Sequence, residues 1–438
     1  MPTTVVELPQ IPKDKEYEEY ISAYLQSSGY YVERNIVERD VEEVLELDVI
    51  ATDYLPEDVV QVMVEIKSGK NWGFSDIFKL RGWMTYLGYS RALFVATVPK
   101  GREDVDDFYV RKSAEMSVDL KIVTELQETQ VQLASYLHGK ILETIDIATW
   151  RFAYWIERKL VERLTKCRRS LQNVQRYEAM FAYYNEINNS VFFTSNILER
   201  IRQLFANFQR NANISAKVGT ELSCGAFEGD EIPSALFRST YFDCQLNDLS
   251  ISSYLEFKSR LTILKYVVDF LAIRDSNPED ERISDHIDFM GVEMSRFDFL
   301  PKEFLDRMER LGEHPYYRNY PAFWQWFVWF FGGFVLLDYK EEEYKMLSQR
   351  SGIPVDDIDK AFEAMSTLFP TDSGWFVDHR TSSIRLLKIF PVPFRGNGAD
   401  FRKKVYTDPP DYHCLRLTGS YTLNDLIKWN NACVDFLK

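Results

Sequence analysis

Residues 62–87 read VMVEIKSGKNWGFSDIFKLRGWMTYL, and the first six of them have the composition of a buried β-strand. Residues two apart in a strand share a face, so Glu65 and Lys67 point to the same side. Val64 and Ile66 are expected to point to the opposite side, into a hydrophobic layer. The strand therefore places an acid and an amine next to each other where a central strand normally carries apolar side chains.

The segments around this strand predict an α/β domain at residues 1–127. The run RALFVATV is almost continuously apolar, which is typical of a strand that is buried on both faces. The expected elements, in chain order, are a helix at 14–28, strands at 30–37, 44–54 and 60–68, a helix at 75–88, a strand at 91–98, and a polar helix and a strand near residue 120. This order indicates a mixed sheet flanked by helices.

The pattern changes beyond about residue 128, where long helical periods replace the strand signals. We expect a mainly α-helical domain at 128–338. Residues 339–438 contain a helix, a Gly-Ile-Pro turn, a second helix and a β-hairpin pattern, an order that favours a winged-helix module. The second helix carries Asp356, Asp357 and other acids, so it suits a protein contact or a structural role better than a phosphate contact.

The composition limits the possible partners. Of the 438 residues, 45% are hydrophobic and 15% are aromatic, so the chain is expected to fold over most of its length. The net charge of −15 has the wrong sign for an open phosphate-binding surface, so a nucleic-acid partner requires a local basic patch, metal ions or another subunit. The five cysteines are scattered without C-x-x-C spacing, which predicts neither disulfides nor a zinc site and fits a reducing cytoplasm.

The most apolar segment is AFWQWFVWFFGGFVLL at 322–337. It is shorter than the ~20 residues that span a bilayer, and Gln325 and a glycine pair interrupt it. We expect a buried core helix here rather than a membrane segment. The amino terminus also lacks the basic and apolar regions of a secretory signal, which again favours a cytoplasmic protein.

Other charged patterns carry weaker signals. The run ERKLVERLTKCRRS at 157–170 could contact phosphates, but a solvated face paired with Glu157 and Glu162 is the favoured interpretation. The five histidines have no metal-ligand spacing. The chain has no G-x-x-x-x-G-K-[ST] motif, so we expect no hydrolysis of nucleoside triphosphates.

A second acid, Asp48, lies in the strand before the opening one, on the face opposite to Leu47 and Val49. If these two strands pair as a hairpin, the carboxylates of Asp48 and Glu65 can converge. Two adjacent carboxylates stay ionised when a cation lies between them, and oxygen ligands of this kind suit Mg²⁺ or Mn²⁺. Lys67 could orient or deprotonate a water molecule and stabilise the charge that develops on a phosphate.

This arrangement resembles the PD-(D/E)xK phosphodiesterase superfamily, which has the restriction-endonuclease-like fold, over residues 14–125. The run YEEYISAYLQSSGYYV at 17–32 is similar to the opening of Mrr-type restriction enzymes. A departure is Leu47, which stands where the family usually has a proline before the first acid. Many relatives also lack that proline, so we do not interpret the difference as loss of activity.

The resemblance implies a set of site residues. The implied catalytic residues are Asp48, Glu65, Lys67, Glu18 and Lys79. The implied metal ligands are Asp48, Glu65, Ile66 and Glu18, with Glu19 as a weaker alternative to Glu18. Lys79 belongs to the helix after the E-x-K strand, and the resemblance places it near the scissile phosphate.

These patterns predict a divalent-metal-dependent nuclease that cleaves DNA in preference to RNA, as an endonuclease rather than an exonuclease. The helical region would bind a protein partner, sense a signal or form a homo-oligomer, and no membrane partner is expected. Regulation by assembly would suit a prokaryotic anti-phage defence effector, by analogy of fold. Two alternatives remain: a catalytically inactive scaffold protein with the nuclease fold, and a solvated edge strand on which Glu65 and Lys67 merely alternate with the core.

Overall fold

The computed structural model describes residues 9–39, 43–56, 58–69, 71–97, 106–168, 174–206, 248–329 and 339–369, with residue 331 and the short segments 334–336, 378–380 and 384–387. The chain divides into two compact units. One comprises Leu8–Trp155 and Asn188–Phe193, and the other comprises Met1–Glu7, Ile156–Ile187 and Thr194–Lys438. The sequence predicts a boundary after residue 127, whereas the first unit continues to Trp155.

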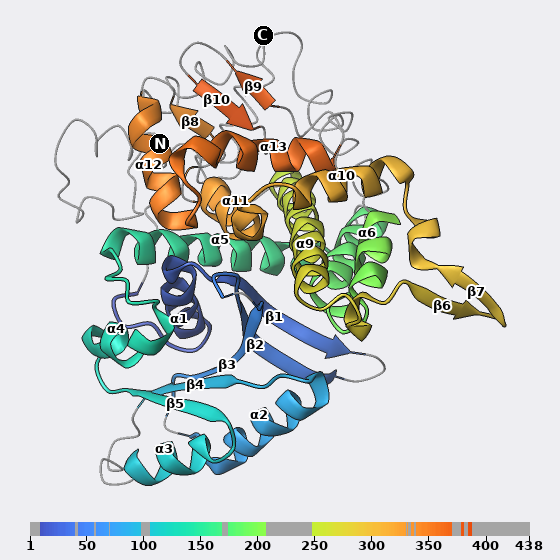
Figure 1. The fold of residues 1–438 in the computed structure, drawn as a ribbon. Helices are drawn as coiled ribbons and strands as arrows, with labels where there is room; N and C mark the ends of the chain where they lie inside the picture. Colours follow the sequence, from blue (N-terminus) through green and yellow to red (C-terminus); the bar gives the residue numbers. More distant parts are fainter. Residues whose placement is uncertain are drawn as a thin grey trace. The chain divides into compact units, whose positions relative to one another are not determined.

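The first unit contains a mixed five-stranded sheet flanked by helices (Figure 1), as the sequence predicts. Its strands are β1 (Tyr31–Arg39), β2 (Glu43–Asp53), β3 (Val60–Lys67), β4 (Ala92–Thr97) and β5 (Val118–Val123), in that spatial order. Its helices include α1 (Lys15–Ser28), α2 (Phe74–Leu87), α3 (Asp106–Ala114), the short α4 (Thr129–Gln132) and the beginning of α5 (Thr144–Arg168). β1, β2 and β3 pair antiparallel, whereas β3, β4 and β5 pair parallel.

The helices cover both faces of this sheet. Figure 1 shows α1 on one face of the sheet and α2 and α3 on the other. The connection from β3 to β4 has to cross back because these strands are parallel, and α2 makes that crossover. α2 buries Ile77, Leu80 and Met84 in a core that also contains Met63 and Phe94. The strand β4 is buried from Ala92 to Ala96, as expected for a strand with both faces covered.

The strand β3 is the central strand of the five. Val64 and Ile66 are buried, as predicted. The opposite face is also covered, because Met63, two residues before Glu65, belongs to the core under α2. Glu65 is itself buried, so the solvated edge strand that the sequence left open is excluded.

The second unit is mainly helical, in agreement with the sequence. The helices described here are α6 (Val174–Asn185), α9 (Asp248–Ser276), α10 (Lys302–Gly312), α11 (Tyr320–Trp329), α12 (Lys340–Ser351) and α13 (Ile358–Leu368). A hairpin joins β6 (His286–Phe289) to β7 (Val292–Ser295), and a small sheet has the order β8 (Phe334–Leu336), β10 (Ile384–Leu387) and β9 (Asp378–Arg380). The strands β9 and β10 pair antiparallel, as the predicted carboxyl-terminal hairpin requires. The rest of that predicted module, including residues 388–438, lies outside the described residues.

The apolar segment at 322–337 does not form a membrane-length helix within the described residues. α11 has ten residues, all of them buried, which confirms the predicted core helix. No helix in the described part of the chain is both long enough and apolar enough to cross a bilayer.

The predicted i,i+4 pairing on the basic helix is present in α5, since Arg158 and Glu162 approach to 3.7 Å.

We expect Gly82→Ala to stabilise the protein. Gly82 lies in the interior of α2, is exposed, and an added Cβ would meet nothing within 4 Å. Replacing glycine by alanine in a helix interior is worth about 0.5–1 kcal/mol, which a urea denaturation curve would measure. Gly88→Ala is the matched control: Gly88 has similar free space but a φ of +73°, so its substitution should destabilise the protein. A lower midpoint for Gly82→Ala would contradict this prediction.

Candidate active site

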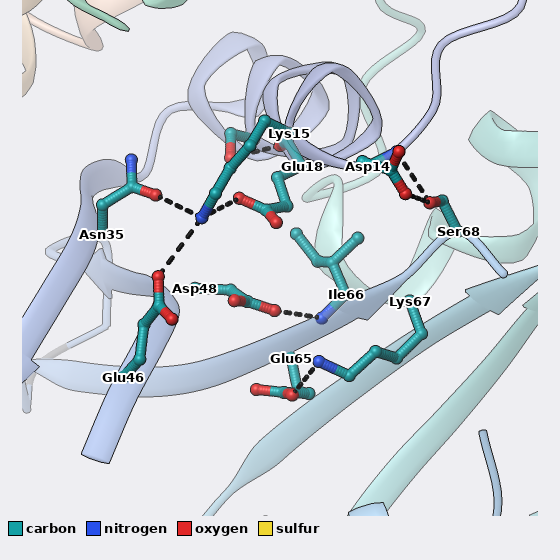
Figure 2. Close-up of polar contacts among 11 residues, drawn as sticks. Asp14, Lys15, Glu18, Asn35, Glu46, Asp48, Glu65, Ile66, Lys67 and Ser68 are labelled. Carbon is teal, nitrogen blue, oxygen red and sulfur yellow. Dashed lines mark hydrogen bonds and ion pairs between the residues drawn. The ribbon is translucent and has the colours of Figure 1, made fainter. Parts of the chain in front are cut away.

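The strands β2 and β3 separate at one end, and Asp48 lies in the space between them. Their ladder runs from Asp53 opposite Val60 to Val49 opposite Val64 and stops there. Successive N–H groups of a central strand point alternately to its two neighbours, so the N–H of Ile66 faces β2 without a ladder partner. It donates instead to Oδ2 of Asp48 at 2.9 Å (Figure 2). The carboxylate of Asp48 is thereby fixed against the backbone of β3.

Glu65 and Lys67 form an ion pair on the same segment. Nζ of Lys67 lies 2.5 Å from Oε1 of Glu65, which places the two predicted residues side by side (Figure 2). The strand β5 carries an acid and a lysine at the same spacing, Asp119 and Lys121, 3.1 Å apart. The Asp119 side chain is 38% exposed, whereas that of Glu65 is 5% exposed. Burial of the acid therefore distinguishes the β3 pair from an ordinary surface pair.

Burial raises the pKa of both carboxyl groups at this site. Burial raises the pKa of Glu65 to about 7, and the nearby charge of Asp48 adds to the rise. Lys67 and Lys79 oppose this shift. Burial also raises the pKa of Asp48 above its ordinary value, against the effects of Lys67 and the Ile66 N–H. Burial alone would lower the pKa of Lys67, but Glu65 and Asp48 raise it overall, so Lys67 stays charged.

Glu18 faces this site from α1. Burial raises its pKa, and the charge of Asp48 is the next largest cause, which places Glu18 within electrostatic range of Asp48. Its carboxylate Oε2 lies 3.4 Å from Nζ of Lys15 (Figure 2). Glu19, the weaker alternative, is also buried, but its charge acts on Arg151 instead. The geometry thus favours Glu18 over Glu19.

The sequence did not identify Lys15 as a site residue. Its ammonium lies 3.2 Å from Glu46 and donates to Oδ1 of Asn35 at 3.1 Å, so it connects α1 to β1 and β2 (Figure 2). Asn35 lies opposite Asp48, between two ladder pairs, and adopts a φ of +52° that asparagine tolerates well. The i,i+3 spacing of Lys15 and Glu18 was the only signal in the sequence for this cluster.

A polar contact also joins the start of α1 to the end of β3. The backbone N–H of Asp14 donates to Oγ of Ser68 at 2.7 Å, and that hydroxyl donates to Oδ1 of Asp14 at 3.2 Å. Asp14 makes no side-chain cap of its own helix. Because Ser68 follows Lys67 directly, this contact fixes the position of Glu18 on α1 relative to Lys67 on β3.

Lys79 lies at the other side of the site, on α2. Its ammonium is 4.2 Å from the centre of the Trp83 ring, a cation–π contact. Its charge also acts on the carboxylate of Glu65, so the predicted residue is within electrostatic range of the β3 pair. No direct contact between Lys79 and Asp48, Glu65 or Lys67 is present among the described residues.

The structure therefore brings the predicted residues together to different degrees. Asp48, Ile66, Glu65 and Lys67 meet at the fork of β2 and β3, and Glu18 and Lys79 flank it. No three Asp, Glu, His or Cys side chains come close enough to hold a metal ion in the part of the chain that the structure describes. The chain matches no protein-family model, no curated protein and no solved structure.

Proposed function

We propose that this protein is a divalent-metal-dependent nuclease that hydrolyses phosphodiester bonds within DNA, in preference to RNA. The observation that carries the proposal is the fork of β2 and β3, where the buried Asp48 is fixed by the Ile66 N–H beside the Glu65–Lys67 pair. This is the arrangement expected from the resemblance to the PD-(D/E)xK superfamily. The acid–lysine pair on β5 has the same spacing, but its acid is 38% exposed.

The donor set fits a hard divalent cation such as Mg²⁺ or Mn²⁺. Asp48 and Glu65 offer carboxylate oxygens, Ile66 can offer only its backbone carbonyl, and Glu18 adds an acid from α1. Water and phosphate oxygens would complete such a shell, because these acids do not form a three-ligand group by themselves. The bound ion would supply Lewis-acid activation of the phosphate and of water. The raised pKa values of Asp48 and Glu65 support this fit, since a cation would favour their ionised forms.

The residues of the chain have distinct roles in this proposal. Lys67, which stays charged beside Glu65, orients the attacking water and stabilises negative charge as it develops on the phosphate. Asp48 and Glu65 would hold the cation, and Glu18 would add a carboxylate ligand from α1. Lys79 contacts the phosphate from α2. With a net charge of −15, the chain depends on these local cations to bind its substrate.

We further propose that the helical region regulates the nuclease through a protein partner or a second copy, as in an anti-phage defence effector. β8, α12, α13 and the β9–β10 hairpin occur in the order expected of a winged-helix module. Asp357 and Asp359 lie at the start of α13, and they already bind Lys360 and Lys340. This acidity favours a protein contact over DNA for that module.

A catalytically inactive scaffold with a nuclease fold is the second candidate. The observation that favours it is that Lys67 already neutralises Glu65, while no group of three potential ligands is present among the described residues. In that case the helical region would carry the function, and the fork would be a buried polar network.

The test is incubation of the full chain with plasmid DNA, single-stranded DNA and RNA in Mg²⁺ or Mn²⁺, with EDTA as the control. We expect DNA to be cut internally, RNA to be cut more slowly, and EDTA to stop both reactions. If no substrate is cut in either metal, and crystals soaked in Mn²⁺ show no ion between Asp48 and Glu65, the scaffold function is correct instead.

A further inference from the structure

The helix α2 exposes large aromatic side chains. Phe78 is 63% exposed, and Phe108 on the neighbouring α3 is 46% exposed. Tyr86 is 62% exposed, and its hydroxyl donates to Oε1 of Glu38 on β1 at 2.9 Å. Large aromatic side chains at such exposure are costly unless they contact a partner, and together they form a patch rather than isolated residues. We refer to Phe74, Phe78, Tyr86 and Phe108 as the α2 aromatic face.

The rings at one end of this face are held in a packed arrangement. Phe74 stacks on Tyr109 with centroids 4.3 Å apart and planes 11° from parallel. Phe108 meets Phe74 edge-on at 5.7 Å, and Phe78 lies 6.4 Å from Phe74. Phe74 contacts Tyr109, Phe108 and Phe78. The exposed rings of Phe78 and Phe108 are therefore packed against Phe74 and lose little conformational freedom when a ligand stacks on them.

A gap separates Phe78 from Tyr86 along the helix. Residues four apart lie on the same side of a helix, so Phe78, Gly82 and Tyr86 form one row. An added Cβ at Gly82 would meet nothing within 4 Å, so packing within the protein does not require glycine there. Phe78 and Tyr86 are separated by about 12 Å along the axis at 1.5 Å per residue. Gly82 therefore leaves an open place between two aromatic side chains, where a flat group can approach the backbone.

Two basic residues lie beside the aromatic residues of α2. α2 contains Lys79 and Arg81, and its only acid, Asp76, accepts the Gly73 N–H at 2.9 Å as part of the helix cap. Lys79 follows Phe78 directly and places its ammonium over Trp83. The charge of the same lysine also acts on the carboxyl group of Glu65. Basic and aromatic side chains alternate here within a chain of strongly negative charge.

We propose that the α2 aromatic face binds single-stranded DNA, with unpaired bases stacked on Phe78 and Phe108 and the phosphates directed past Lys79. This inference rests on the proposed nuclease function and specifies its substrate. Aromatic platforms interleaved with basic residues recognise unpaired bases, because every base has a π-face that a duplex keeps hidden in its stack.

The test measures binding of a fluorescein-labelled oligothymidylate and of a labelled mixed-sequence duplex by fluorescence anisotropy, in EDTA so that nothing is cut. We expect the full chain to bind the single strand more tightly than the duplex. Phe78→Ala and Phe108→Ala should each weaken single-strand binding by roughly tenfold, the size expected for one lost stacking contact. Phe289→Ala is the matched control, because Phe289 is 58% exposed on the β6–β7 hairpin; it should leave binding unchanged.

Gly82→Gln separates binding from folding. Glutamine is a better helix former than glycine, so the variant should melt no lower than the parent, while its side chain fills the gap and weakens single-strand binding. Unchanged binding in Phe78→Ala and Phe108→Ala, or equal affinity for the duplex, would overturn the inference. So would a change from dimer to monomer in Phe78→Ala, measured by sedimentation, with DNA binding unaffected.

The outcomes also distinguish this inference from the nuclease proposal. If the parent cuts DNA and Phe78→Ala and Phe108→Ala bind the oligothymidylate as tightly as the parent does, the single-strand inference fails and the nuclease proposal stands. If the single strand binds and Phe78→Ala loses it, but nothing is cut in Mg²⁺ or Mn²⁺, the binding inference stands and the nuclease proposal fails.

Discussion

Lys67→Met is expected to lower the rate of DNA cleavage by on the order of 10³-fold, within the range found when a charge-stabilising catalytic group is removed. Methionine retains the apolar stem of lysine, so the packing beside β3 is largely kept. The substitution removes the ammonium that lies 2.5 Å from Glu65, and with it the cation proposed to orient water and stabilise the phosphate. The rate would be measured under single-turnover conditions in saturating Mg²⁺.

The matched control is Lys121→Met on β5. Lys121 pairs at 3.1 Å with an acid two residues away in the same sheet, but that acid, Asp119, is 38% exposed, whereas Glu65 is 5% exposed. We expect cleavage by this variant to stay within about twofold of the parent, because surface ion pairs contribute little. Equal losses in both variants would mean that charge on the sheet, rather than the fork, supports the activity. No loss in Lys67→Met would remove this lysine from the mechanism.

Much of the first unit could be predicted from the sequence because its signals are local. The order of helices and strands follows from alternation within short segments, and Gly29 and Gly88 end α1 and α2 in the left-handed conformation. The prediction that Glu65 and Lys67 share a face depends only on the two-residue period of a strand. These parts of the site follow from neighbours in the chain.

Other parts of the site depend on contacts between distant segments. The burial of Glu65 results from the helix α2, which covers a face that the alternation alone would leave in solvent. The bond from Ile66 to Asp48 exists because β2 and β3 separate after Val49, and no local pattern indicates where two strands part. The role of Lys15 likewise requires α1 to lie against β1 and β2.

The extent of the first unit has a similar explanation. Residues beyond 127 pack against α1 and the sheet: the hydroxyl of Tyr20 donates to Oγ1 of Thr129 at 3.3 Å, and Arg34 lies 4.5 Å from the ring centre of Tyr154. These segments have helical periodicity, which favours a separate helical domain when only the sequence is considered. Their partners are more than a hundred residues away, so periodicity could not assign them to the sheet.

Mn²⁺ is expected to stabilise the protein strongly, and the effect should grow as the pH rises from 5 to 8. A ligand present at 100 times its dissociation constant adds about 2.7 kcal/mol to the free energy of unfolding. The pKa of Glu65 is about 7, so a proton competes with the metal below that pH. Without metal, protonated Glu65 contributes its full stabilisation below pH 4.5, the pKa of this group in the unfolded chain. This contribution is lost as the pH rises through about 7, the pKa of Glu65 in the folded protein. The stabilisation by the metal is therefore expected to be largest at pH 8, where Glu65 is ionised and no proton competes with the ion.

Asp48→Asn tests whether this stabilisation arises at the fork. The asparagine oxygen can still accept the Ile66 N–H, so the strands keep their arrangement, while one of the two repelling carboxylates is lost. Its metal-free form should be more stable than the parent above pH 7, because Asp48 no longer raises the free energy of ionised Glu65. It should also lose nearly all of the Mn²⁺-dependent rise in melting temperature, whereas Asp119→Asn on β5, away from the fork, should keep it. An equal response to Mn²⁺ in Asp48→Asn and the parent would place the bound ion away from β2 and β3, because an ion at the fork would have lost one of its carboxylate ligands.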